Sequence, residues 1–187
     1  AADKIFIASN NYSKKKFSVV RYGNVFGSRG SVIPLFIEQA KKGTVQITDN
    51  RMTRFTITLQ QGVNFVIDRL AKMWGGEIFV PKISSYRIKD VAKAFAPKAK
   101  VINIGLRAGE KMHEEMITTS DSYNTLEFHN YYVILPTTQD FINWNLKNFI
   151  KKSDSSTGKF CKENFSYNSY NNPNYVTISE LKKMGEN

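Results

Sequence analysis

Two different spacings of hydrophobic positions alternate along the chain. Short runs rich in β-branched and aromatic residues predict strands, and they are residues 17–22, 45–47, 77–80, 101–104 and 131–135. Apolar residues spaced by three or four positions predict helices, and these are residues 32–40, 59–74, 88–95 and 177–184. Strands that alternate with helices in this way predict the α/β class of fold.

The ends of the predicted helices carry capping signals. Ser31 is a suitable N-cap for the first helix, and Pro34 is compatible with its first turn, where N–H groups have no helical partner. Thr177 or Ser179 can cap the last helix. Residues 153–174 are rich in Ser, Asn, Tyr and Lys, which predicts a long loop or a peripheral arm. The elements are too few for a complete dinucleotide-binding unit, and no Gly-x-Gly-x-x-Gly motif follows a strand.

The composition indicates a globular protein. The chain has 187 residues, of which 41% are apolar, enough for one good-sized domain. No stretch approaches the roughly 20 apolar residues of a membrane helix. The single cysteine, Cys161, excludes an internal disulfide, and His113 and His129 lack the spacing of metal ligands. The chain begins at Ala1 without an initiator Met, so we expect a piece of a longer protein.

The chain is strongly basic, with 27 Lys and Arg against 16 Asp and Glu and a net charge of +11. Such a charge is compatible with binding to nucleic acid or to another anionic partner. Lys greatly outnumbers Arg and is scattered along the chain, which is typical of a solvated surface. No nucleic-acid-binding motif is present, and the aromatic residues are not interleaved with the Arg residues. A non-catalytic basic binding module remains an alternative.

The first candidate binding motif is residues 21–31, a strand end, a glycine-spaced loop and a helix start. In an open α/β sheet, ligands bind beyond the carboxyl ends of strands, and a helix N-terminus offers unpaired N–H groups to an anion. Asn24 can donate and accept hydrogen bonds at once, which suits a sugar hydroxyl or a phosphate oxygen. The alternative is a glycine-rich turn in which Asn24 adopts a left-handed conformation.

Two further motifs carry charge on loops. In the polar loop at residues 48–55, Arg51 and Arg54 could hold a phosphate, or else form a solvated pair with Asp49. In the loop at residues 105–111, Arg107 suits a diphosphate and Glu110 suits ribose hydroxyls. The alternative for this second loop is a charged surface turn.

Two positions after the second loop have their own expected roles. His113 could line the same pocket as the loop. The acidic pair Glu114 and Glu115 is more simply a solvated helix start.

Taken in order, these motifs resemble one enzyme family, the inverting UDP-N-acetylglucosamine 4,6-dehydratases, a polysaccharide-biosynthesis branch of the extended short-chain dehydrogenases/reductases. The matching segments are FSVVRYGNV (17–25), GSRGSVIP (27–34), ITD (47–49), RMTRF (51–55), GGEIFVPK (75–82), GEKMHE (109–114), YYVI (131–134) and NP (172–173). The chain departs from the family pattern at Ala108, where Pro is preferred, and at Thr56, where an aromatic residue is commoner.

The resemblance implies the carboxyl-terminal part of a Rossmann-like fold with its small substrate-binding subdomain. Residues 1–150 would form the rest of the Rossmann-like domain interleaved with that subdomain, and residues 151–187 a peripheral arm with a terminal helix. It places the nucleotide-binding glycine motif and the catalytic Tyr-x-x-x-Lys pair upstream of Ala1, so no catalytic residue is expected here. The implied function is the sugar-nucleotide-binding portion of a lyase that is inactive alone.

The resemblance also implies roles for single residues. Asn24 would contact the sugar or a phosphate, Arg54 and Arg107 the diphosphate, and Glu110 the ribose. Val25 and Ser28 would lie on the side of the cofactor, which is NADP or NAD in the complete enzyme. A UDP-sugar is the expected partner of a cytoplasmic homo-oligomer, without metal, membrane or nucleic acid. A nucleotide-sugar epimerase is the alternative within the same class.

Overall fold

The computed structural model describes residues 2–136, 145–153 and 158–185. The chain forms two compact units, each assembled from three separated segments. Unit 1 comprises Ala1–Tyr22, Gln60–Lys82 and Met116–Ser166, and unit 2 comprises Gly23–Leu59, Ile83–Glu115 and Tyr167–Asn187. The expected division at residue 150 stays a prediction, whereas the observed contacts divide the chain into these interleaved segments.

Unit 1 is built on a five-stranded sheet with the order β1-β5-β10-β9-β11. Its strands are β1 (Val19–Val20), β5 (Ile78–Pro81), β9 (Thr125–Glu127), β10 (Tyr131–Ile134) and β11 (Lys159–Phe160). β1 runs parallel to β5, and the other neighbours are antiparallel. Its helices are α1 (Ala2–Ala8), the 3₁₀ turn η1 (Ser9–Asn11), α3 (Leu59–Lys72), α5 (Thr119–Ser122) and α6 (Leu146–Ser153).

Helix α3 packs on the rest of unit 1 through a face other than its apolar stripe. Phe65 and Arg69 face inward, and the Arg69 guanidinium lies 3.9 Å from the centre of the Tyr131 ring. The buried aromatic surface therefore accommodates this cation through the negative face of the ring. The apolar stripe that predicted the helix lies outward, with Ile67 62% and Leu70 65% exposed.

Unit 2 contains a three-stranded sheet with the order β2-β4-β6 and a parallel pair, β3 and β7. These strands are β2 (Asn24–Val25), β4 (Thr53–Ile57), β6 (Ser84–Arg87), β3 (Thr44–Ile47) and β7 (Lys100–Asn103). β2 runs parallel and β6 antiparallel to β4. The helices of unit 2 are α2 (Val32–Ala40), α4 (Ile88–Phe95) and α7 (Ile178–Gly185), and the short strands β8 (Glu115–Ile117) and β12 (Tyr167–Asn168) complete the elements.

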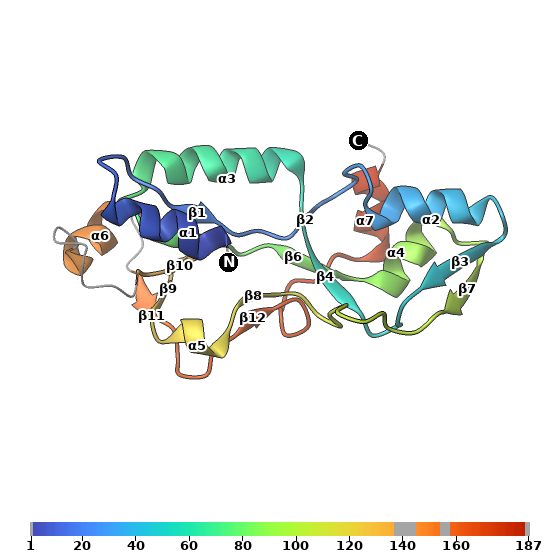
Figure 1. Ribbon diagram of the computed structural model, residues 1–187. Helices are drawn as coiled ribbons and strands as arrows, with labels where there is room; N and C mark the ends of the chain where they lie inside the picture. Colours follow the sequence, from blue (N-terminus) through green and yellow to red (C-terminus); the bar gives the residue numbers. More distant parts are fainter. Residues whose placement is uncertain (1, 137–144, 154–157, 186–187) are drawn as a thin grey trace. The chain divides into compact units, whose positions relative to one another are not determined.

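The core of unit 2 lies among α2, α4, α7 and β3 (Figure 1). Phe36 of α2, Val45 of β3, Val91 of α4 and Leu181 of α7 are at most 1% exposed. Leu181 lies in the predicted terminal helix, which therefore contributes to a core. The mixture of helices with parallel and antiparallel strands confirms the predicted α/β class.

Several predicted elements are confirmed, and the polar loop before β4 is wrong in part. The helix at residues 88–95 has the predicted bounds. Of the two candidate caps for the last helix, Thr177 is the one used, since its Oγ1 accepts from the Glu180 N–H at 3.2 Å. The polar loop expected at residues 48–55 is wrong at its end, because β4 begins at Thr53. Within the described residues, no helix is both long enough and apolar enough to cross a membrane.

Candidate functional site

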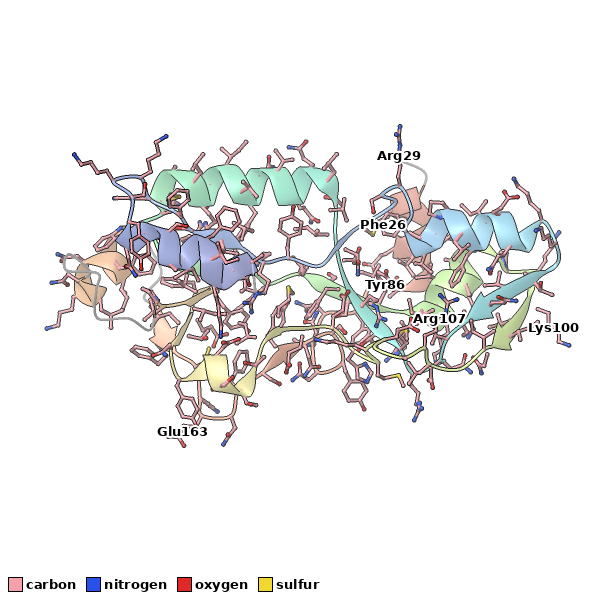
Figure 2. All side chains as sticks on the ribbon, viewed as in Figure 1. Phe26, Arg29, Tyr86, Lys100, Arg107 and Glu163 are labelled. Carbon is pink, nitrogen blue, oxygen red and sulfur yellow. The ribbon has the colours of Figure 1, made fainter. Side chains whose placement is uncertain are left out.

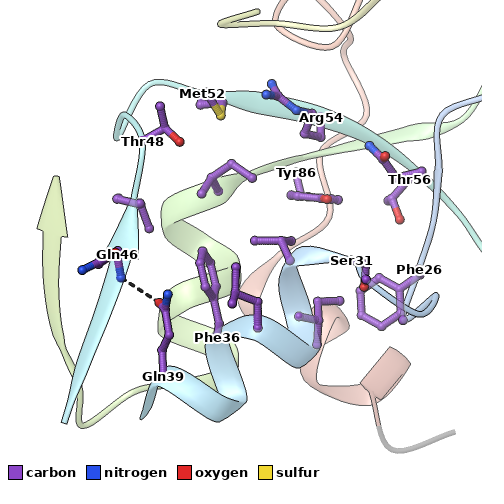
Figure 3. A pocket seen from close by; sticks show the side chains of 18 of the residues that line it. Phe26, Ser31, Phe36, Gln39, Gln46, Thr48, Met52, Arg54, Thr56 and Tyr86 are labelled. Atoms are coloured by element: carbon purple, nitrogen blue, oxygen red, sulfur yellow. Dashed lines mark hydrogen bonds between the residues drawn. The ribbon is translucent and has the colours of Figure 1, made fainter. Parts of the chain in front are cut away.

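Unit 2 contains a pocket of about 350 Å³ (Figure 3). Its walls come from β2 and the turn after it, the first turns of α2, the end of β3, and strands β4 and β6. The segment after β7, which carries Arg107 and Glu110, closes another side. The first candidate motif and the two charged motifs therefore contribute to one cavity.

Strand alternation explains which residues of β4 face this pocket. Side chains of a strand point alternately to its two faces, and Met52, Arg54 and Thr56 line the pocket. Phe55 points to the other face, where its ring lies 4.8 Å from that of Tyr167. The polar residues of this segment are therefore the pocket face of a strand.

Gly23 permits β2 to approach β4 closely. A Cβ at this position would lie 2.4 Å from the Cβ of Phe55, a distance that real side chains do not adopt. The approach allows the Phe26 N–H to donate to the Ile57 carbonyl at 2.9 Å. Glycine is thus needed here for contact between strands, and this contact places Asn24 beside β4.

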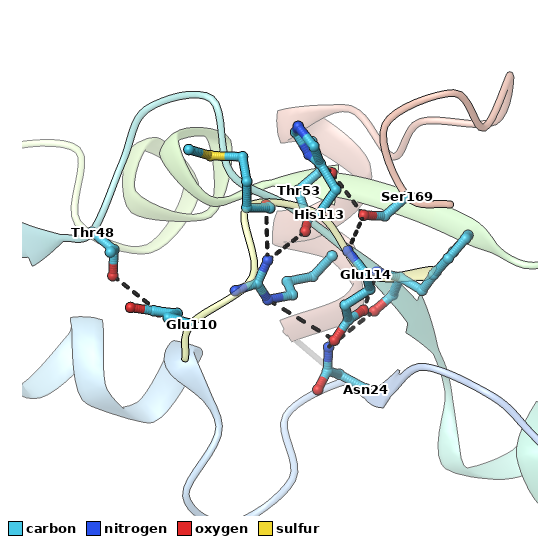
Figure 4. Close-up of polar contacts among 10 residues, drawn as sticks. Asn24, Thr48, Thr53, Glu110, His113, Glu114 and Ser169 are labelled. Atoms are coloured by element: carbon cyan, nitrogen blue, oxygen red, sulfur yellow. Dashed lines mark hydrogen bonds and ion pairs between the residues drawn. The ribbon is translucent and has the colours of Figure 1, made fainter. Parts of the chain in front are cut away.

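The Glu114 carboxylate organises one end of the site (Figure 4). Its oxygens accept from the Phe55 N–H at 2.8 Å and from Asn24 Nδ2 at 2.9 Å. The Arg54 Nε lies 3.9 Å from the same carboxylate, and Arg54 Nη1 donates to the carbonyls of Thr53 and Met112 at 2.7 and 3.1 Å. Glu114 therefore orients Asn24, and it adds a carboxylate beside Arg54, which the two carbonyls already hold. The expectation of a solvated helix start at this position is wrong, because Glu114 lies outside any helix, directly before β8, and its carboxylate is engaged in the site.

A second set of hydrogen bonds supports Glu114 from behind. The Glu114 N–H donates to Ser169 Oγ at 2.9 Å, and Ser169 Oγ lies 2.7 Å from Thr53 Oγ1. Thr53 Oγ1 also lies 2.8 Å from His113 Nδ1. Burial, followed by the nearby Arg54 and Arg51 charges, lowers the pKa of His113 below 6.5. His113 is absent from the pocket lining, so it supports the site rather than facing the cavity.

The loop after β7 holds the other predicted pair. Glu110 Oε1 accepts from Thr48 Oγ1 at 3.2 Å, and its Oε2 accepts from the Arg107 N–H at 3.4 Å. The Gly105 N–H donates to the Thr48 carbonyl at 3.1 Å, which ties the loop to the end of β3. Arg107 and Glu110 both line the pocket, and the Arg107 side chain is exposed. The structure thus brings Asn24, Arg54, Arg107 and Glu110 to one cavity.

The two residues expected on the cofactor side differ in position. Val25 is half-buried and lines the pocket. Ser28 is exposed and does not line it, and its N–H donates to the Val25 carbonyl at 3.2 Å in the turn after β2. The neighbouring Arg29 extends into solvent, away from the pocket residues Phe26 and Tyr86 (Figure 2).

Arg51 forms the solvated pair that the sequence left open as an alternative. Its Nη2 lies 2.9 Å from Asp49 Oδ2, and its side chain is 76% exposed. The hydrogen bond from Arg51 lowers the pKa of Asp49 to about 2. Arg51 does not line the pocket, so of the two arginines in this motif only Arg54 reaches the cavity.

Sequence reasoning missed Glu114 and Ser169 as functional supports. Glu114 lies within the matched segment GEKMHE, and this match is a signal for function. Because Glu115 follows it, the acidic pair by itself predicts a solvated helix start instead. Ser169 lies in a segment without hydrophobic periodicity, and nothing local marks it, although it is fully buried. Among the described residues, no group of three or more His, Cys, Asp or Glu side chains is placed to hold a metal ion.

A family and several individual proteins are similar to this chain. The family described as "Polysaccharide biosynthesis protein" matches residues 1–136. A UDP-N-acetylglucosamine 4,6-dehydratase (inverting) of Campylobacter jejuni is 47% identical over 98% of this chain and 56% of its own length. A UDP-glucose 4-epimerase of Rickettsia canadensis is 43% identical over 62% of this chain and 36% of its own length.

A solved structure shows the same fold. The X-ray structure of Pen from Bacillus thuringiensis superposes with a TM-score of 0.76 at 30% identity, over 99% of this chain and 54% of that one. The chain therefore spans about half the length of the dehydratases and of the solved structure that it matches.

Proposed function

Since the chain belongs to the polysaccharide biosynthesis protein family, we propose that it is the sugar-nucleotide-binding portion of a UDP-N-acetylglucosamine 4,6-dehydratase. The observation that carries the proposal is the meeting of Arg54, Arg107, Glu110 and Asn24 at one pocket. The 47% identical relative bears the name of this enzyme. A pocket of about 350 Å³ lies within the range of small-molecule sites.

The charges of the pocket match the parts of a sugar nucleotide. Arg54 and Arg107 supply two cations to a diphosphate, and Arg pairs well with phosphate because its planar guanidinium donates several hydrogen bonds. Glu110 accepts hydrogen bonds from ribose hydroxyls. Asn24, whose amide Glu114 orients at 2.9 Å, contacts the sugar or the adjoining phosphate.

The cofactor of the complete enzyme is NADP or NAD in this proposal. Val25 offers an apolar wall beside the pocket, and the exposed Ser28 hydroxyl is available in the same turn, so both residues fit the edge of a nicotinamide cofactor. The cofactor supplies hydride transfer. The residues of this chain would hold and orient the sugar nucleotide beside it. A cytoplasmic location and a homo-oligomeric complete enzyme are part of the same proposal.

Binding of UDP to Arg107 variants tests the proposal. Arg107→Ala removes a charge-assisted contact to the diphosphate, and we expect UDP binding to weaken by about 1.5–3 kcal/mol in isothermal titration calorimetry. Arg29→Ala is the matched control, because Arg29 is exposed and points away from the pocket. An unchanged UDP affinity in Arg107→Ala would overturn the assignment. Binding of generic DNA that falls steeply with salt, without UDP binding, would support the basic binding module instead.

An epimerase is the second candidate, because epimerases are also among the relatives at 43% identity. The two reactions differ in mass balance: dehydration removes one water from the sugar nucleotide, whereas epimerisation leaves its mass unchanged. Mass spectrometry of the product formed by the complete enzyme from UDP-N-acetylglucosamine separates them. A product of unchanged mass would support the epimerase.

A further inference from the structure

Two hydroxyl groups at one end of the pocket have no hydrogen-bond partner in the part of the chain that the structure describes. They are Thr56 Oγ1 and Ser31 Oγ, and both atoms are buried. The Thr56 residue is only 3% exposed, and both residues line the pocket. A buried hydroxyl without a partner costs free energy, so such groups in native proteins commonly await a ligand or a water molecule.

The chain itself explains why Ser31 has a free hydroxyl. Ser31 is the N-cap of α2 by its backbone angles, with φ −73° and ψ 167°, yet its side chain makes no capping hydrogen bond. An N-cap hydroxyl normally accepts from a backbone N–H two or three residues later. The residue three positions later is Pro34, which has no N–H. Pro34 therefore removes a usual partner of this hydroxyl, which stays available at the pocket wall.

The geometry of β4 explains the direction of Thr56. Met52, Arg54 and Thr56 lie on the same face of the strand, with a rise of roughly 3.3 Å per residue. Met52 adjoins the turn from β3, where its N–H donates to the Asp49 carbonyl at 3.2 Å. At the other end of this row, Thr56 pairs with Asn24 across the parallel strands.

The row of Met52, Arg54 and Thr56 runs along the pocket from one end to the other. Glu110, bonded to Thr48 at 3.2 Å, lies toward the Met52 end. Arg54 stands in the middle, and Thr56 and Ser31 lie at the Asn24 end (Figure 3). A ligand with its ribose at Glu110 and its diphosphate at Arg54 thus presents its sugar to the two hydroxyls.

We infer that Thr56 and Ser31 form a hydroxyl subsite for the sugar of the sugar nucleotide; the inference rests on the proposed function. A hydroxyl can donate to an oxygen of the sugar and accept from one of its hydroxyls. Sugars offer both kinds of group on every face, whereas the nucleobase lies beyond the ribose at the Glu110 end.

Calorimetric titration of the 187-residue chain with UDP and with UDP-N-acetylglucosamine tests the subsite. Thr56→Val keeps the shape of the side chain and removes the hydroxyl. We expect the affinity for UDP-N-acetylglucosamine to fall about fivefold to tenfold, while the affinity for UDP stays unchanged. Thr56→Ser should restore the affinity for the sugar nucleotide. Thr44→Val, on β3 and outside the pocket lining, is the matched control.

Thermal unfolding excludes a merely structural role for Thr56. Removing a buried hydroxyl that has no partner should leave the melting temperature of the ligand-free chain unchanged or higher. Equal affinities of wild type and Thr56→Val for the sugar nucleotide would overturn the subsite while leaving the proposed function intact. A wild-type chain that binds neither UDP nor UDP-N-acetylglucosamine would overturn the proposed function, and the subsite with it.

Discussion

Replacement of Glu114 by Ala gives the sharpest test of how the site is held together. The change removes the acceptor of the Phe55 N–H, at 2.8 Å, from a residue that is 0% exposed. A buried donor left without a partner costs about 1–3 kcal/mol. Asn24 is exposed, so water can replace its bond at 2.9 Å with little loss. Arg54 keeps the carbonyls of Thr53 and Met112, which limits the cost of losing the carboxylate at 3.9 Å.

These contributions together predict a loss of about 2–3 kcal/mol in the free energy of unfolding. For a chain of this size, each kcal/mol corresponds to roughly 2–4 °C in melting temperature. We therefore expect Glu114→Ala to melt about 4–12 °C below wild type in circular dichroism. The matched control is Glu115→Ala, because Glu115 is the exposed neighbour. Equal melting temperatures of the two variants would refute the role of Glu114 as the centre of this network.

Two further predictions concern the surroundings of the site. Asp49 should titrate in NMR near pH 2, because Arg51 lowers its pKa from 3.8, and Arg51→Gln should move the midpoint up. A lowered pKa in the folded state stabilises the protein above the ordinary value of 3.8, and this contribution should disappear as the pH falls through about 2. Ser169→Ala should lower the free energy of unfolding by about 1–3 kcal/mol in urea titration, because the Glu114 N–H loses its acceptor. Ser179→Ala, at an exposed position, is the control, and an equal effect in both variants would contradict the buried role of Ser169.

The sequence predicts those parts of the fold whose signal is local. The helix Ile88–Phe95 has the expected bounds, because Ile88, Val91 and Ala92 repeat at helical spacing and all three are buried. Strand β4 escaped prediction although residues 54–57 alternate between polar and apolar side chains, because this alternation is short and directly follows a charged polar segment. A strand of five residues that begins inside a polar segment therefore gives only a weak hydrophobic signal.

The sequence predicts the charged residues of the site, but not the residues that hold them in place. Arg54, Arg107 and Glu110 stand in short motifs, and the motifs converge on one pocket. The partners of Glu114 lie 59 and 90 positions away in the sequence, at Phe55 and Asn24. Pairings over such distances leave no local pattern, and an acidic pair alone is more often a solvated feature. Only the folded chain shows which carboxylate is engaged.

The two arginines of the pocket differ in how firmly each is held before a diphosphate binds. The Arg54 guanidinium is fixed before any ligand arrives, because two carbonyls hold its Nη1 and its side chain is only 16% exposed. A fixed group loses little conformational entropy on binding, so Arg54 can set the position of the diphosphate. The Arg107 side chain is exposed, and its freedom must be lost when it binds. Arg107 can instead reach a ligand that has already entered, which gives the pocket one rigid cation and one adaptable cation.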